Sequence, residues 1–336
     1  MKGCLFVAAV LLLVSCNNSD KAPDVSGVTI NLKTERFEKS LFDTSAPSLL
    51  SYLQRLESSD PTFTSTYLNK ILNADPRWPA DTTAAFVNGF VKAFRPIYDS
   101  AEKIFSDFSP YEKEISKGLQ YVKHYFPDYK TPEKIITYIG PLDGYGDIIS
   151  PEGFLVGLHH HLGAGSTLYK SEFVRETYPD YISNRFQPDY ITVNCLKNVV
   201  LDIYPEKESD KPLVNQMIEK GKRLYILSKF LPGTEEYKLI GYTDQQTKDS
   251  YKNEAVIWDL FVKNNYLQTT DKNISKNFID EGPKTQELGE GAPGNIGSFT
   301  GWQIVKKYMQ KNPAVSLKQL ISLDEETIFQ EAKYKP

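Results

Sequence analysis

The sequence predicts an α+β protein that is mainly helical, and three features of its 336 residues support this class. Apolar residues recur every three or four positions over residues 41–120, as they do in amphipathic helices. Short runs of apolar and β-branched residues at 135–139 and 153–158 indicate a small sheet. Helical spacing returns after Gly165. We therefore expect a helical N-terminal half, a small sheet, and then further helices.

The first residues have the features of a bacterial lipoprotein export signal. Lys2 gives a positive start, residues 5–14 are apolar throughout, and small residues stand directly before Cys16. The apolar run is too short for a transmembrane helix, which needs about 20 residues. We predict a signal peptide at residues 1–15, cleavage before Cys16 and lipidation of that cysteine. An ordinary signal peptide with a chance cysteine is the alternative.

The mature chain is predicted to be a tethered single domain. Residues 16–27 are polar and show no apolar period, which is typical of a flexible spacer. No stretch rich in Pro, Gly and Ser divides residues 28–336, so we expect them to fold as one domain. Lipid on Cys16 would hold the domain at a membrane. Asn17 and Asn18 carry no recognisable inner-membrane retention signal, which favours the outer membrane, facing the periplasm.

Charge and cysteine content exclude some classes of protein. The formal net charge is −4, and loss of Lys2 with the signal peptide would make it −5. No basic field favours nucleic acid as a partner. Cys4 would leave with the signal peptide and Cys16 would be acylated, so Cys195 has no intramolecular partner. We expect a fold without disulfides.

The order of the elements follows from proline positions and apolar spacing. Polar residues precede prolines at Asp60-Pro61, Asp75-Pro76, Arg95-Pro96 and Ser109-Pro110, which predicts helix starts or turns, with a break at Pro96. The runs at 135–139 and 153–158 flank a segment rich in Gly and Asp, 140–146, and are expected to form a hairpin or a small sheet. Later helices are predicted at residues 171–184, 188–204, 213–231, 244–264, 297–311 and 316–321.

Three consecutive histidines, His159 to His161, are the first candidate for a metal site. In a strand, His159 and His161 would share one face, so at most two could bind one ion. No Cys or His elsewhere has zinc-site spacing. Two alternatives remain: a metal site at His159 and His161, and a partly exposed cluster in a strand whose imidazole rings pack against each other. We favour the second.

Other candidate motifs favour structural interpretations. The segment 289–297 is rich in glycine but lacks the Gly-Lys-Ser/Thr ending of a phosphate-binding loop, so we expect a turn that opens a helix. Cys195 is predicted within a helix without a nearby histidine, as a buried or partly buried thiol. The chain also holds 21 Tyr and 18 Phe, which could form core or an aromatic groove for a protein or glycan.

Several segments of the second half form a series with a characteristic order and spacing. They include Tyr178-Pro179-Asp180-Tyr181-Ile182, Met217-Ile218-Glu219-Lys220-Gly221-Lys222, Ile240-Gly241-Tyr242-Thr243, Pro293-Gly294-Asn295-Ile296-Gly297, Thr300-Gly301-Trp302-Gln303-Ile304-Val305 and the ending Lys333-Tyr334-Lys335-Pro336. This series resembles the gliding-motility lipoprotein family GldB of the Bacteroidetes, from about Ile135 to the C-terminus. The resemblance implies a role in the motility machinery and the linked protein-secretion apparatus.

GldB-like chains are in turn similar to predicted zinc metallopeptidases, in which a His-Glu-x-x-His helix supplies two ligands and the general base. The matching positions here are Asn194, Cys195 and Asn198, with Glu219 near the third-ligand position. Amide oxygens are poor zinc ligands, and a thiol cannot replace the carboxylate base. The resemblance implies a degenerate zincin-like core without metal or peptidase chemistry. With Arg223, these residues could line a remaining cleft, or they could form hydrogen bonds within a helical core.

These observations favour a non-enzymatic, lipid-anchored component of a cell-envelope motility or secretion assembly, with envelope proteins as partners and no cofactor. One alternative is an envelope metallopeptidase or hydrolase that uses the His159 to His161 cluster with Glu219. Another is a peptide- or glycan-binding lipoprotein with an exposed aromatic groove.

Overall fold

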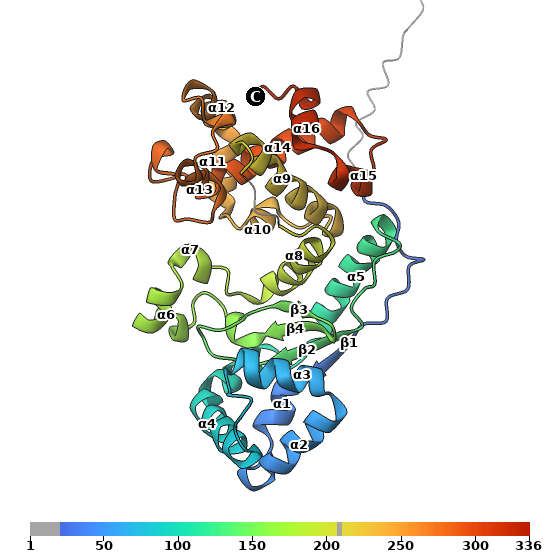
Figure 1. Ribbon diagram of the computed structural model, residues 1–336, viewed down its shortest axis with the longest axis vertical. Coiled ribbons are helices and arrows are strands. Elements are labelled where there is room, and N and C mark those ends of the chain that lie inside the picture. The colour runs from blue at the N-terminus through green and yellow to red at the C-terminus, as the bar shows by residue number, and fades with distance from the viewer. Residues whose placement is uncertain (1–20, 207–209) are drawn as a thin grey trace, which may run out of the picture.

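The computed structural model describes residues 21–206 and 210–336. The predicted signal peptide and the lipidation site at Cys16 lie outside the described residues. Figure 1 shows an elongated molecule with a small sheet across its middle, helices of the N-terminal half on one side of the sheet and later helices on the other. The mainly helical α+β class predicted from the sequence is confirmed. Within the predicted spacer, Val25 is buried.

Four strands form one mixed sheet in the order β1-β2-β4-β3. They are β1 (Lys33–Arg36), β2 (Lys134–Tyr138), β3 (Ile148–Ser150) and β4 (Gly153–Gly157). Strands β1, β2 and β4 pair in parallel, whereas β3 pairs antiparallel with β4 at the edge. The central strands β2 and β4 are almost wholly buried, as parallel strands are when helices cover both faces of a sheet.

The small sheet predicted at residues 135–139 and 153–158 is confirmed, but the two segments are not the strands of one hairpin. These segments contain β2 and β4, which run parallel, with Ile135 opposite Phe154. The connection between them is long enough to add β3 as an edge strand before the chain reverses. The hairpin is therefore formed by β3 and β4, and its turn leads into Gly153, which has a φ of +136° that favours glycine.

Helices of the N-terminal half cover one face of the sheet (Figure 1). They are α1 (Phe37–Phe42), α2 (Leu49–Ser59), α3 (Pro61–Ser65) and α4 (Ala80–Ile104). Asp60 caps α3 as predicted, because its side chain accepts a hydrogen bond from Phe63 N. The predicted break at Pro96 is wrong, since α4 continues through it. Pro96 lies on the exposed face, where water can satisfy the carbonyl that loses its partner, and Ile97 and Ala101 anchor the second half of α4 in the core.

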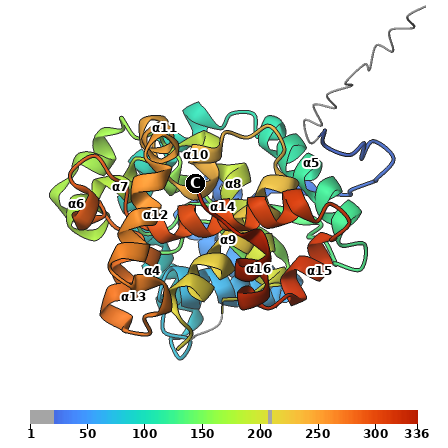
Figure 2. The same cartoon turned by 90° about the horizontal axis from the view of Figure 1, so that it is seen from above.

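The opposite face of the sheet is covered by α5 (Ser109–Tyr125) and α8 (Ile191–Ile203), and a further helical layer lies above them (Figure 1). Its main members are α9 (Leu213–Phe230) and α14 (Ile296–Lys311), and Figure 2 shows α14 lying against α9. The remaining α-helices are α6 (Glu172–Thr177), α7 (Asp180–Ser183), α10 (Glu236–Ile240), α11 (Asp244–Lys252), α12 (Glu254–Lys263), α13 (Lys272–Ile279), α15 (Leu317–Ser322) and α16 (Glu325–Ala332).

Two predicted helices are each divided in the structure. The segment 171–184 is split before Pro179, because the residue before a proline disfavours the helical conformation. The segment 244–264 is split at Asn253, which has non-helical backbone angles. The predicted helices at 188–204, 213–231, 297–311 and 316–321 are confirmed to within a few residues at each end.

Two glycines allow α9 and α14 to pack closely. A Cβ atom on Gly301 would overlap the backbone carbonyl of Met217 in α9, and one on Gly221 would overlap the backbone of Gly301. The two helix backbones therefore touch where a side chain would hold them apart. Lys222, also on α9, is fully buried and forms an ion pair of 2.7 Å with Glu325 at the start of α16. These contacts join the C-terminal helices to α9.

No helix within residues 21–206 and 210–336 is both long and apolar enough to cross a membrane.

Replacement of Gly301 by alanine is expected to lower the free energy of unfolding by about 2–3 kcal/mol, because α9 and α14 must separate to admit the methyl group. The matched control is Gly89→Ala on the exposed face of α4, where a Cβ meets nothing within 4 Å. The control is expected to stabilise α4 by about 0.5–1 kcal/mol. Urea denaturation measures both values, and an equal effect of the two substitutions would contradict the close contact.

Candidate functional site

A buried aspartate, Asp147, connects the sheet to α8. It stands directly before β3, and its side chain is only 2% exposed. Its Oδ2 atom lies 2.8 Å from His161 Nε2 and accepts a hydrogen bond of 2.8 Å from Asn194 Nδ2. Its Oδ1 atom accepts from Gly157 N at 3.2 Å, and its backbone oxygen accepts from Asn198 Nδ2 at 2.9 Å. Asp147 therefore holds the end of β4, the histidine cluster and α8 together.

The helical spacing of Asn194 and Asn198 explains why both reach the same residue. Positions four apart lie on one face of a helix, here the face of α8 that is directed at Asp147. Both amides act as N–H donors in these contacts. The polar groups at the two positions that match metal ligands in the peptidase pattern are therefore bonded within the protein.

The histidine cluster does not lie in a strand, which corrects the sequence-based expectation. Strand β4 ends at Gly157, opposite the last residue of β2, so no neighbouring strand remains for pairing. The chain turns into a short 3₁₀ helix, Leu158–His160, closed by a hydrogen bond from His161 N to Leu158 O. The three imidazoles are also buried, at 0%, 7% and 1% exposure, rather than partly exposed.

Each histidine has its own partners. His159 Nδ1 accepts from Gly140 N at 3.1 Å, and the His160 ring stacks on Phe186 with centroids 4.5 Å apart. Burial lowers the pKa values of His159 and His160. Burial opposes the charge on His161 as well, but the Asp147 carboxylate and the Gln187 carbonyl outweigh it and raise the pKa of His161. Of the three histidines, only His161 has a pKa shifted in favour of its charged form.

The residues that the structure describes are not arranged as ligands around a metal ion. In the described ranges, 21–206 and 210–336, no three or more His, Cys, Asp or Glu residues are grouped closely enough to hold a metal ion. Both ring nitrogens of His161 are engaged, by Asp147 and by Gln187. Cys195 is buried, and burial together with the nearby charge of Asp147 raises the pKa of its thiol well above the ordinary value. A neutral, buried thiol is a poor base at neutral pH.

Glu219 and Arg223, the other predicted cleft residues, lie on α9 beside Tyr204. Arg223 donates to the Tyr204 carbonyl at 3.1 Å and to the Pro205 carbonyl at 2.8 Å, and its guanidinium lies 4.5 Å from the centroid of the Tyr204 ring. Glu219 accepts from the Tyr204 hydroxyl at 3.4 Å. The structure therefore places the predicted residues in two groups, around Asp147 and around Tyr204. No hydrogen bond in the described part of the chain links these two groups.

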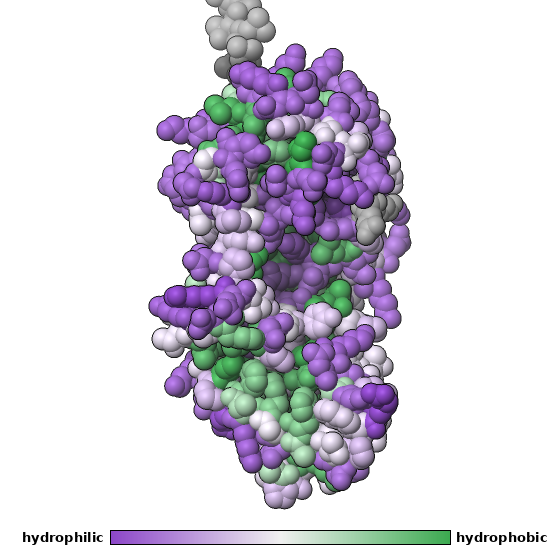
Figure 3. Space-filling view, turned by 60° about the vertical axis from the view of Figure 1, so that its left-hand side comes forward, coloured by the Kyte–Doolittle hydropathy of each residue, from purple (hydrophilic) through white to green (hydrophobic). Residues whose placement is uncertain are grey.

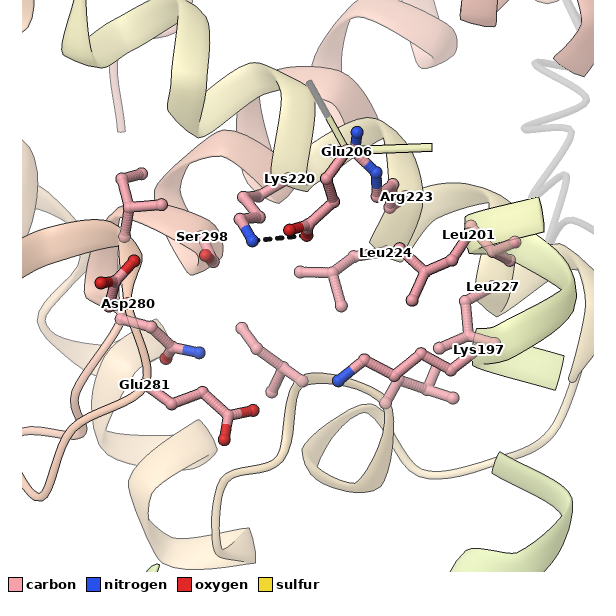
Figure 4. A pocket seen from close by; sticks show the side chains of 15 residues that line it. Lys197, Leu201, Glu206, Lys220, Arg223, Leu224, Leu227, Asp280, Glu281 and Ser298 are labelled. Atoms are coloured by element: carbon pink, nitrogen blue, oxygen red, sulfur yellow. Dashed lines mark hydrogen bonds and ion pairs between the residues drawn. The ribbon is translucent and has the colours of Figure 1, made fainter. Parts of the chain in front are cut away.

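A separate cleft of about 200 Å³ lies among α8, α9, α10, the segment that follows α13 and the start of α14. Figure 3 shows that the surface is hollowed about midway along the molecule, and Figure 4 shows the cleft from close by. Its apolar lining is Val200, Leu201, Leu224, Leu227, Leu239, Ile240 and Ile279. Its polar lining is Lys197, Glu206, Lys220, Arg223, Asp280, Glu281, Asn295 and Ser298.

Most charges around this cleft are paired. Lys220 pairs with Glu206 at 2.6 Å, and Arg185 pairs with Glu281 at 2.5 Å. Among the predicted site residues only Arg223 lines the cleft. Lys197 was not predicted from the sequence as a cleft residue, although a lysine in a helix that is mostly buried was a possible signal.

Replacement of Asp147 by asparagine is expected to lower the free energy of unfolding by about 3 kcal/mol near pH 5.5, where His161 is charged and would lose its buried partner. Because the folded-state pKa of His161 is raised, stabilisation by the ion pair is complete below its unfolded pKa of about 6.5 and declines as the pH rises through the folded pKa. The loss should therefore be smaller near pH 9. Urea denaturation at both pH values measures the difference.

The control is Asp99→Asn on α4, since Asp99 pairs with Arg95 where both side chains are about half exposed. Exposed pairs contribute little, so neither stability nor its pH dependence should change measurably. If Asp147→Asn behaved in the same way as this control, Asp147 could not hold the sheet and α8 together.

Comparison with known proteins identifies a matching family. A family profile described as gliding motility protein GldB matches residues 18–336, which is nearly the whole chain. No curated protein and no solved structure matches the chain. The zincin-like part of the sequence-based prediction therefore stays a prediction. The extent of the profile match places the chain in the family of GldB gliding motility proteins.

Proposed function

We propose that the protein is a lipid-anchored, non-enzymatic component of the envelope machinery for gliding motility or for the linked secretion of proteins. Family membership supports the association with motility. The hydrogen bonds around Asp147 are the main support for the proposal that the protein is not an enzyme. Asn194 and Asn198 stand where the peptidase pattern requires ligands, and both donate to Asp147. A ligand must instead direct a lone pair toward the metal.

The same contacts weigh against the enzyme alternative. His161 is engaged through both ring nitrogens, and Cys195 stands where a general base is needed. Asp147 pairs with His161 and accepts hydrogen bonds from Asn194 and Asn198 of α8, which is a structural role. We propose that the protein acts by binding other envelope proteins and that α8 helps to build the binding surface.

The sequence pattern around Cys16 supports attachment through lipid, with the domain at the outer membrane and facing the periplasm. Cys16→Ser removes the acylated sulfur and should move the protein from the membrane fraction to the soluble fraction of the envelope. Cys195→Ser is the matched control, because the buried Cys195 is not available for acylation and the variant should remain membrane-bound. Fractionation of cells that express each variant measures this, and a membrane-bound Cys16→Ser protein would contradict the lipid anchor.

The assembly role is tested by pull-down of the lipidated protein from its own membrane. Recovery of motility or secretion proteins is expected with the unaltered chain and with Cys195→Ser. Recovery of no specific protein would count against the proposal. Metal analysis of the same preparation distinguishes this proposal from the enzyme alternative. A metallopeptidase would contain stoichiometric zinc and would lose all function when the zinc is removed.

A further inference from the structure

Two polar side chains face the cleft among α8, α9 and α14 without a partner. The Lys197 ammonium group reaches into it from α8, and in the described part of the chain it forms no ion pair or hydrogen bond. Ser298 lies on the other side, in the first turn of α14 (Figure 4). Ser298 is only 4% exposed, and its hydroxyl has no hydrogen-bond partner among the described residues. Both groups can donate a hydrogen bond to a bound ligand.

The surroundings of Lys197 favour a negatively charged ligand. Lys197 is exposed at the cleft, and the carboxylates of Glu281 and Glu206 and the cations of Arg185 and Lys220 lie around its ammonium group. Glu281 is itself paired with Arg185. Glu206 is paired with Lys220, so both carboxylates around Lys197 already have another cationic partner and the Lys197 ammonium group could bind an anion.

The N-terminus of α14 also favours a negatively charged ligand. Asn295, at its N-terminus, makes no side-chain capping hydrogen bond, and the first turn contains no acidic residue. The N-terminus of a helix carries a partial positive charge. Ser298 and the start of α14 thus provide donors opposite Lys197.

The surface of the cleft between these donors is apolar, and the volume of the cleft limits the size of the ligand. Leu201 and Leu224 are partly exposed in the cleft, and Leu227 and Ile240 are buried beneath it. The cleft volume of about 200 Å³ is below the range of about 300–1,000 Å³ that is usual for small-molecule sites. It corresponds to about seven water molecules at about 30 Å³ each, which suits a single amino-acid residue.

A third polar group favours a peptide over a fatty acid. Asp280 lines the cleft and, in the described chain, its carboxylate has no hydrogen bond or ion pair. A peptide offers backbone N–H groups to such an acceptor, whereas a fatty acid has no donor. We infer that the cleft binds the C-terminal end of a partner polypeptide, with the terminal carboxylate between Lys197 and Ser298, an apolar last side chain on Leu201 and Leu224, and a backbone N–H directed to Asp280.

This inference rests on the proposed function in one respect, since it takes the peptide to belong to an envelope partner. The test is made with the purified, lipidated full chain in detergent, so that it does not depend on the pull-down. The probe is the pentapeptide Gly-Ser-Ala-Ala-Leu, labelled with fluorescein at its N-terminus and followed by fluorescence anisotropy. A second probe has the same sequence with a C-terminal amide.

The free carboxylate probe is expected to bind, and amidation should weaken binding about tenfold or more, because a charge-assisted hydrogen bond is lost. Lys197→Gln should cause a similar loss for the carboxylate probe and little change for the amide. Lys307→Gln is the matched control, since Lys307 is an exposed lysine on α14 that does not line this cleft. Thermal unfolding of each variant checks that the fold is retained.

Three results would overturn the inference. One is no binding of the carboxylate probe at about 1 mM, which is a weak-binding limit. The second is equal binding of the acid and the amide to the unaltered protein, a comparison that needs no variant. The third is displacement of the probe by decanoate at a lower concentration than by unlabelled peptide, which would assign the cleft to fatty acids. Failure here leaves lipid anchoring and assembly, tested by fractionation and pull-down, unaffected.

Discussion

The arrangement of the central part of the molecule depends on the buried carboxylate of Asp147. A carboxylate away from water is costly unless its oxygens are satisfied, and Asp147 meets His161, Asn194 and Gly157 through its side chain and Asn198 through its backbone. These contacts lock α8 against the β3 and β4 edge of the sheet. Lys197, Val200 and Leu201 lie on the same helix as the two asparagines that Asp147 holds. The contacts of Asp147 therefore also position these three residues, which line the cleft.

Asn194 and Asn198 have the four-residue spacing of the ligands in the predicted peptidase pattern, and both are bonded to Asp147. In a metallopeptidase the metal would join α8 to its neighbours and supply the chemistry. In this protein Asp147 joins α8 to the sheet. The side-chain amides of Asn194 and Asn198 can bond to it because they donate hydrogen bonds to its oxygens. The close contact at Gly221 and Gly301 holds α9 and α14 together, and both helices line the cleft. We propose that the fold keeps a precise cleft while the catalytic groups are absent from it.

Several features of the fold could be predicted from the sequence, and the exceptions have physical reasons. Apolar spacing locates α8, α9 and α14, since each buries a wide face. Strand β1 has the sequence Lys-Thr-Glu-Arg and no apolar residue, so only its pairing with β2 reveals it. Asp147 lies in a Gly/Asp-rich segment that is typical of a loop, and its partners are distant in sequence. Lys197 and Ser298 line the same cleft only because α8 and α14 pack around α9, which local patterns do not encode.

We propose that the protein works by binding a partner at the cleft. The most direct measurement is photocrosslinking in living cells, with a photoreactive amino acid in place of Leu201 in the cleft. A second chain carries it in place of Val256, which is 59% exposed on α12 and lies outside the cleft lining. Position 201 should give a single crosslinked motility or secretion protein through its C-terminal peptide, and position 256 should not. A crosslink to that protein only from position 256, or to a segment other than its C-terminus, would contradict the claim.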